Sequence, residues 1–141
     1  MTPASIFEPM LVMLLLTIVV WLWLFARRTA YMMANNIDAE QVKTPEQVQQ
    51  LIPDHVSAPA HNFKNLFEVP VLFYVVCLMA VALNQVDGLL INCAWAFVIL
   101  RALHSIVHCT YNRVMHRFLS YMVSCLVLWF MVGKLAWAVF F

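Results

Sequence analysis

The sequence contains four stretches that are each apolar over about the 20 residues that a helix needs to cross a lipid bilayer. They cover approximately residues 6–27, 57–84, 89–111 and 117–139. Hydrophobic residues make up 65% of the chain and charged residues 11%, whereas soluble domains have about 45–50% and about 25%. Because backbone groups in lipid must be hydrogen-bonded within their own segment, such stretches form helices. The sequence therefore predicts one all-α membrane domain over residues 1–141, an antiparallel bundle of four transmembrane helices.

The longest polar segment, residues 29–56, connects the first two predicted helices and holds most of the chain's acidic residues. Within it, Thr44 is a typical N-cap, Pro45 suits the first helical position, and Gln47 follows the cap by three residues. A short helix is therefore expected to begin inside this polar segment. The other connections are short.

Lys and Arg residues gather at one end of the predicted bundle. They are Arg27, Arg28, Lys43, Lys64, Arg113 and Arg117. The connection between the second and third predicted helices has neither. Since cytoplasmic loops of membrane proteins are enriched in Lys and Arg, this end is expected to face the cytoplasm. We therefore expect an integral, multi-pass membrane protein with both termini on the non-cytoplasmic side, in the inner membrane if the cell is bacterial.

A charged residue and two histidines lie within the third apolar stretch. Placing a charge at bilayer depth costs roughly 2.5–3.5 kcal/mol on insertion scales. Arg101, His104 and His108 follow a spacing of i, i+3, i+7, which puts them on one helical face. That face is expected to meet partners, water or a ligand inside the bundle.

Two further helices carry polar stripes with the same spacing. One consists of His61, Asn65 and Glu68, with Lys64 beside them, and the other of Arg117, Tyr121 and Ser124. Three stripes at matching ends predict a shared pocket, although Glu68 and Arg101 could instead form a buried pair that only fixes helix packing. Cations outnumber the single acid, which favours an anionic ligand such as a small zwitterion with more than one carboxylate. The co-substrate of this ligand could be apolar and arrive through the membrane lipids. No nucleic acid is expected as a partner.

A metal or haem site is a weaker alternative. His104 and His108 have the i, i+4 spacing of metal ligands, and His61, His116 or Glu68 could complete a site. Against this, Arg101 lies one turn away on the same face and would repel a cation, and the chain has no HExxH motif. We therefore predict no metal ligands.

The segment Asn65-Leu66-Phe67-Glu68-Val69-Pro70, followed by the Arg101–His108 pattern and then Arg113, Arg117 and Tyr121, resembles the MAPEG family. These are membrane-associated proteins in eicosanoid and glutathione metabolism. The resemblance implies a four-helix homotrimer that binds glutathione between neighbouring subunits near the cytosolic side. The short loops are similar to those of bacterial members.

The resemblance also implies roles for individual residues. Glutathione contacts fall on Asn65, Glu68, Arg101, His104, Arg117 and Tyr121, and Arg117 would stabilise the glutathione thiolate as the catalytic residue. Arg27 or Arg28 would contribute from the first helix. Family members often have arginine at the position of His61, arginine or another polar residue at that of Lys64, and tyrosine at that of His108. Arg113 lies nearby. Phe118 stands where the prostaglandin synthase of the family has a serine.

The expected function is that of a membrane-bound, glutathione-dependent transferase or peroxidase that acts on apolar electrophiles or lipid peroxides. A non-catalytic lipid-binding or scaffold protein of the same fold is the alternative.

Overall fold

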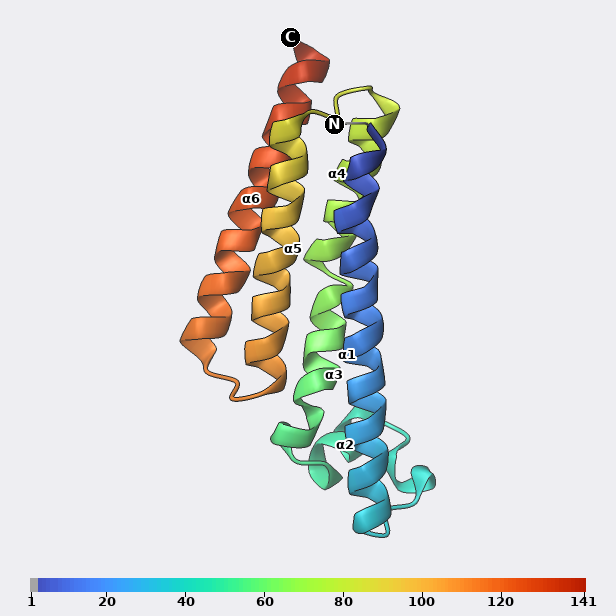
Figure 1. Cartoon of the computed structure of the whole chain (residues 1–141). Coiled ribbons are helices and arrows are strands. Elements are labelled where there is room, and N and C mark those ends of the chain that lie inside the picture. Colours follow the sequence, from blue (N-terminus) through green and yellow to red (C-terminus); the bar gives the residue numbers. More distant parts are fainter. Residues whose placement is uncertain (1–2) are drawn as a thin grey trace.

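The structure is a computed structural model that describes residues 3–141, and all regular elements in this range are helical (Figure 1). The first two residues of the predicted domain lie outside this range. The helices are η1 (Pro3–Ile6), α1 (Phe7–Ala34), η2 (Ala39–Val42), α2 (Pro45–Leu51), α3 (Asp54–Leu66), α4 (Val69–Ala82), α5 (Gly88–Cys109) and α6 (Val114–Phe140), of which η1 and η2 are 3₁₀-helices.

Four candidate membrane spans lie within the described residues: Ala4–Ala34, Asp54–Ala82, Gly88–Cys109 and Val114–Phe140. Each is long and apolar enough to cross a bilayer. The prediction of an all-α fold with four transmembrane helices is therefore confirmed.

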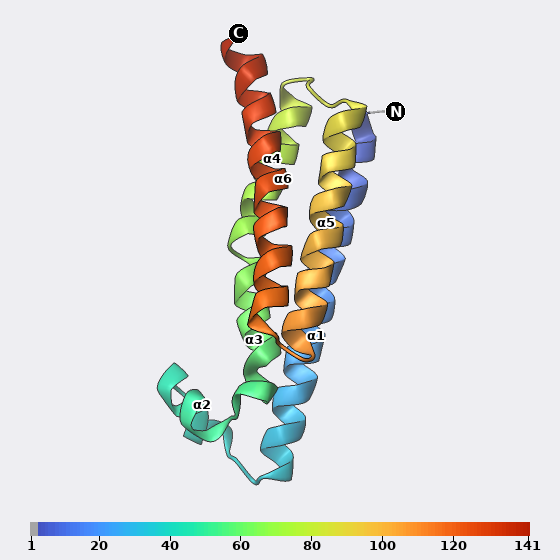
Figure 2. The ribbon, with the colours of Figure 1, turned by 90° about the vertical axis from the view of Figure 1, so that its left-hand side faces the viewer.

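The spans run antiparallel, as Figures 1 and 2 show from two directions. The described ends of the chain lie at one end of the bundle, and the connection that contains α2 lies at the other. The turn between α5 and α6 points toward the same end as α2. The polar ends of the spans therefore lie together.

The second span was expected to be one continuous helix over residues 57–84, but the structure divides it into two helices. The helix α3 ends at Leu66, and α4 begins at Val69. Pro70 lies in the first turn of α4, where it has no backbone N–H to donate to the carbonyl of Leu66 four residues earlier. Between the two helices, Glu68 has a non-helical backbone, with φ −98° and ψ −101°. Carbonyl groups in the last turn of α3 thus become available to other helices.

The first and last spans are longer at the polar end than expected. The helix α1 continues through Arg27 and Arg28 to Ala34 and stops just before Asn36, whose φ of 52° is left-handed. The helix α6 already begins at Val114. The predicted helix start at Thr44 is confirmed, because Thr44 accepts a hydrogen bond from the backbone N–H of Gln47 and α2 follows.

The apolar core lies mainly in the half of the bundle away from α2. Phe73 of α4 and Phe97 of α5 are fully buried and stack with their ring centroids 4.5 Å apart. Met13, Leu128 and Met131 are also buried there. Outside this core, all four spans expose many large apolar side chains. An apolar exterior of this extent is suited to contact with lipid tails.

The connection between α4 and α5 is fastened by one acidic residue. Asp87 caps α5 by accepting a 2.8 Å hydrogen bond from the backbone N–H of Leu90. The same carboxylate lies 2.8 Å from the ammonium group of Lys134 on α6. The hydrogen bond from Lys134, and next the one from Leu90, hold the pKa of Asp87 below its usual value. The pair joins α5 and α6 at the end opposite the polar connection.

Replacing Asp87 should lower stability in a way that depends on pH. Asp87→Ala removes the cap and should cost about 1 kcal/mol in the free energy of unfolding. Because the folded-state pKa is depressed, the carboxylate's contribution is complete above the unfolded pKa of about 3.9 and is lost as the pH falls through the lower folded-state value. Unfolding of the detergent-solubilised protein at neutral pH and at about pH 3 measures this.

Asp87→Asn is the matched control, because it keeps a capping oxygen but has no carboxylate. Its stability should change less with pH than that of the original protein. An equal response to pH in the two proteins would contradict a contribution from the Asp87–Lys134 pair.

Candidate functional site

Arg101 is fully buried within the bundle and connects three helices. From α5, its Nη2 donates a 3.1 Å hydrogen bond to the backbone carbonyl of Asn65, in the last turn of α3. Its guanidinium carbon lies 5.3 Å from the ring centroid of Tyr121 on α6, a cation–π distance. The break after α3 thus supplies a carbonyl partner for a buried charge.

Glu68 does not pair with Arg101. Glu68 is exposed, and the ion pairs among residues 3–141 are Lys43–Glu40 and Lys134–Asp87. The alternative in which a Glu68–Arg101 pair only fixes helix packing therefore has no support in the structure.

His104 and His108 are almost fully buried on the same face of α5, with 2% and 3% of their surfaces exposed. His104 Nδ1 lies 3.0 Å from the backbone carbonyl of Arg117. Since a carbonyl only accepts hydrogen bonds, Nδ1 is the donor, and in the neutral ring Nε2 is an acceptor. His108 Nε2 lies 3.1 Å from Arg117 Nη1 and accepts from it, so the His108 hydrogen is on Nδ1.

Arg117 is held at the start of α6 by the turn that precedes it. Its Nη1 donates to His108 Nε2 and, over 2.8 Å, to Asn112 Oδ1. Asn112 has a left-handed φ of 48°, and its backbone N–H donates to the carbonyl of Val107. Asparagine tolerates this conformation better than most residues. The turn therefore fixes both the backbone and the side-chain acceptor that orient Arg117.

These groups surround a cavity of about 420 Å³, which we call the polar cavity. Its lining residues are His61, Asn65, Glu68, His104, His108, Val114, Arg117, Phe118 and Tyr121. Arg101 is not a lining residue but contacts Asn65 and Tyr121, which are. All but two of the lining residues, Val114 and Phe118, come from the three polar stripes of the sequence.

Several buried polar atoms around this cavity have no hydrogen-bond partner in the described chain. They are Asn65 Oδ1, Arg101 Nε and Nη1, His104 Nε2 and His108 Nδ1. A buried polar group without a partner costs about 1–3 kcal/mol, so such groups are uncommon in folded proteins. Here donors and acceptors occur together, as a polar ligand with both kinds of group requires.

Besides Arg101, four predicted site residues do not line the polar cavity. Arg27 donates a 3.3 Å hydrogen bond to the backbone carbonyl of Cys109 at the end of α5. A cation at this place is favourable because the C-terminal end of a helix carries a partial negative charge. Lys64 and Arg113 are exposed and line neither this cavity nor the one described next. Arg28 lines that second cavity. Ser124, the last residue of the α6 stripe, instead donates to the carbonyl of Tyr121.

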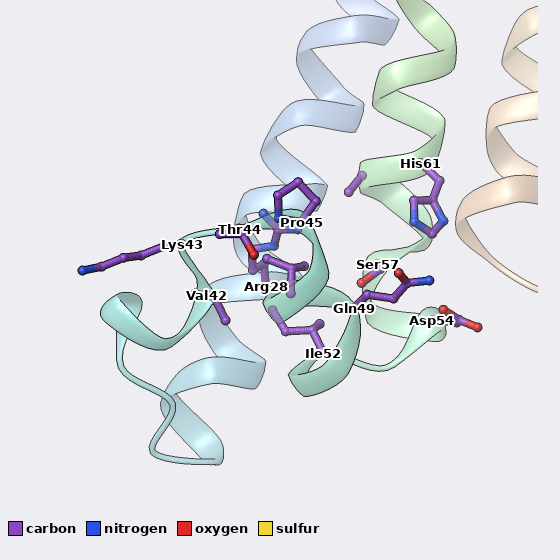
Figure 3. A pocket seen from close by; sticks show the side chains of 12 residues that line it. Arg28, Val42, Lys43, Thr44, Pro45, Gln49, Ile52, Asp54, Ser57 and His61 are labelled. Carbon is purple, nitrogen blue, oxygen red and sulfur yellow. The ribbon is translucent and has the colours of Figure 1, made fainter.

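A second cavity of about 500 Å³, which we call the end cavity, lies among the end of α1, the connection containing α2, and the start of α3 (Figure 3). Its lining residues are Arg28, Val42, Lys43, Thr44, Pro45, Val48, Gln49, Ile52, Asp54, Ser57, Ala60 and His61. His61 also lines the polar cavity. The two cavities are therefore neighbours.

Asn112 and Val114 were missed as site residues, and Phe118 was noted only as the position where a family member has a serine. The role of Asn112 depends on a left-handed turn, for which an asparagine between two helices is the available sequence signal. Val114 lies just before the expected start of the fourth span, and nothing in the sequence distinguishes it from lipid-facing apolar residues.

Metal binding has no geometric support within residues 3–141. These residues include no group of three or more His, Cys, Asp or Glu side chains placed to hold a metal ion. The two buried histidines of α5 instead use a ring nitrogen each in contacts with Arg117.

Changes at Asn112 should separate its backbone role from its side-chain role. Asn112→Ala should be less stable than Asn112→Gly by about 1 kcal/mol, because alanine is strained in the left-handed region and glycine is not. Both variants lose the hydrogen bond to Arg117. Chemical unfolding in detergent compares them, and equal stability of the two variants would contradict a left-handed turn at this position.

The comparisons with known proteins point to one family. The sequence model of the MAPEG family matches residues 6–137, nearly the full chain. Searches of curated proteins and of solved structures gave no significant match. The family includes glutathione transferases and peroxidases as well as non-catalytic members. The four spans and this match are those of an integral, multi-pass membrane protein. The chain belongs to the MAPEG family.

Proposed function

We propose that the protein is a membrane-bound, glutathione-dependent transferase or peroxidase that acts on apolar electrophiles or lipid peroxides. One observation carries the proposal: buried donors and acceptors without partners, from α3 and α5, gather around a single cavity. Arg117 and the carboxylate of Glu68 line the same cavity.

The side chains around the polar cavity fit the chemistry of glutathione, which has two carboxylates, an ammonium group, two peptide units and a thiol. The free Nε and Nη1 of Arg101 are charged donors, and each suits a carboxylate oxygen. Asn65 Oδ1 and His104 Nε2 would accept hydrogen bonds from N–H groups, and His108 Nδ1 would donate one. Glu68 would hold the ammonium group, and Tyr121 and His61 complete the wall.

Arg117 is the proposed catalytic residue. When bound, glutathione supplies a thiolate that attacks an electrophilic carbon or a peroxide oxygen. An arginine about 4 Å from a thiolate stabilises it by about 4 kcal/mol at an effective dielectric constant of about 20, before desolvation. A hundredfold increase in the thiolate fraction needs about 2.7 kcal/mol. Arg117, oriented by His108 and Asn112, could meet this need alone.

The apolar co-substrate would enter from the lipid. Val114 and Phe118 line the polar cavity next to Arg117, and both are exposed on the outside of α6. An apolar molecule dissolved in the bilayer could therefore reach the cavity without crossing water.

A homotrimer is the proposed assembly, as the family resemblance implies. Glu68, Lys64 and Arg113 are exposed near the polar cavity's end of the bundle. Exposed charges at membrane depth are costly, and contact with a second copy would cover them. We further propose that this end faces the cytoplasm, with both termini on the opposite side, because it carries the excess of Lys and Arg. If the cell is bacterial, the membrane is the inner one.

Arg117→Ala should strongly reduce the thiolate signal of bound glutathione. Ultraviolet difference titration of the purified protein with glutathione near neutral pH measures thiolate absorbance. We expect a band whose intensity falls at least about tenfold in Arg117→Ala, because the stabilising charge is lost. Arg117→Lys should retain part of it, since a lysine keeps the charge but not the planar fork.

Lys43→Gln is the matched control, since it also removes one cation, but from an exposed side chain paired with Glu40. The band should be unchanged in this variant. If the original protein gives no thiolate band and binds no glutathione, the transferase proposal fails, and the non-catalytic lipid-binding or scaffold alternative takes its place.

Arg101→Met should weaken glutathione binding about tenfold to hundredfold, because a hydrogen-bonded charge is lost. Once the variant is saturated with glutathione, its thiolate fraction should equal that of the original protein. Calorimetric titration gives the affinity, and the absorbance at saturation gives the thiolate fraction. A reduced thiolate fraction at full saturation would contradict the division of roles between Arg101 and Arg117.

A further inference from the structure

The end cavity has a polar side and an apolar side. Figure 3 shows Arg28 between α1 and the start of α2, with Ser57 and His61 on the facing part of α3. Ser57 and His61 are separated by one helical turn and so share a face. The apolar side is formed by Val42, Pro45, Val48, Ile52 and Ala60. Its walls therefore suit a molecule that has both polar and apolar parts.

Arg28 is the cation directed at this cavity. It is half-buried, and its side chain has neither an ion pair nor a hydrogen bond within the described part of the chain. The other cation of the lining, Lys43, is paired with Glu40 and points outward. Asp54 lies at the edge, with its carboxylate directed away from the cavity. The charge that faces the interior is thus positive.

Ser57 adds a second polar group without a partner. Only 7% of its surface is exposed, and its hydroxyl makes no hydrogen bond within residues 3–141. The oxygen is not one of the fully buried polar atoms without a partner, so it is accessible from the cavity that Ser57 lines. Together with Arg28, it offers donors to an anion, because a serine hydroxyl and a guanidinium both donate.

We infer that the end cavity is a second binding site, which takes an amphiphile with a carboxylate or phosphate head. Arg28 and Ser57 bind the head, and the chain of the amphiphile packs along Val48 and Ile52. The cavity lies at the end of the spans where lipid headgroups are found, so the ligand is either a membrane lipid or a free fatty acid. This inference goes beyond the proposed glutathione function, because it uses a different cavity and does not require Arg117 or Arg101.

The test uses the full chain in nanodiscs of phosphatidylcholine, a lipid with no net charge. Calorimetric titrations with decanoate and with lysophosphatidylglycerol, each corrected by titration of empty nanodiscs, distinguish the two sources of the anionic head. We expect saturable binding of at least one of them. Arg28→Gln should weaken that binding about tenfold or more, because it removes a charged hydrogen-bond donor.

Two further variants distinguish a specific binding site from non-specific attraction of the anionic probe to nearby cations. Lys43→Gln removes one cation from the same rim and should leave the affinity unchanged. Ala60→Leu adds bulk to the cavity wall while keeping Arg28, and should also weaken binding about tenfold or more. Equal losses in Arg28→Gln and Lys43→Gln, or no saturable binding of either probe, would overturn the inference.

The outcome is independent of the glutathione proposal. Arg117→Ala should bind the amphiphile with unchanged affinity, even if no thiolate band exists. If glutathione displaces the probe and Arg117→Ala also loses it, the end cavity belongs to the glutathione site and the inference fails.

Discussion

The hydrogen bond from Arg101 to the carbonyl of Asn65 is the contact on which the polar half of the bundle depends. A guanidinium without water is tolerated in a membrane protein only when other groups of the protein compensate it. In this chain the compensation comes from a backbone oxygen of α3 and from the ring of Tyr121 on α6. The charge therefore fixes three helices relative to one another at the depth of the polar cavity.

That compensation exists because a proline interrupts the second span. Pro70 ends the regular hydrogen bonding between α3 and α4, and irregular backbone at membrane depth is tolerated where it is covered by protein or lines a cavity. The break, the buried arginine and the cavity thus form one unit. The turn at Asn112 makes a similar arrangement for Arg117, because local backbone geometry places a side-chain acceptor beside a cation.

Sequence reasoning found the spans and most of the polar cavity, because both depend on periodicity and hydropathy. The spacing of Arg101, His104 and His108 placed them on one face, and the structure buries all three. Sequence reasoning could not choose between Arg27 and Arg28, because the one that meets α5 depends on how α1 packs against it. It also could not predict that Glu68 is exposed and unpaired while it lines the polar cavity, since its backbone at the break is not helical.

The concentration of polar contacts at one end has a consequence for the evolution of the chain. In the other half, stacked and packed apolar side chains such as Phe73 and Phe97 are constrained mainly by volume and hydrophobicity. Cores of this kind tolerate many simultaneous exchanges if total volume is kept. That half can accumulate substitutions quickly, while the polar end changes slowly, so distant homologues of this protein should remain alignable mainly through the residues around the break and the α5–α6 turn.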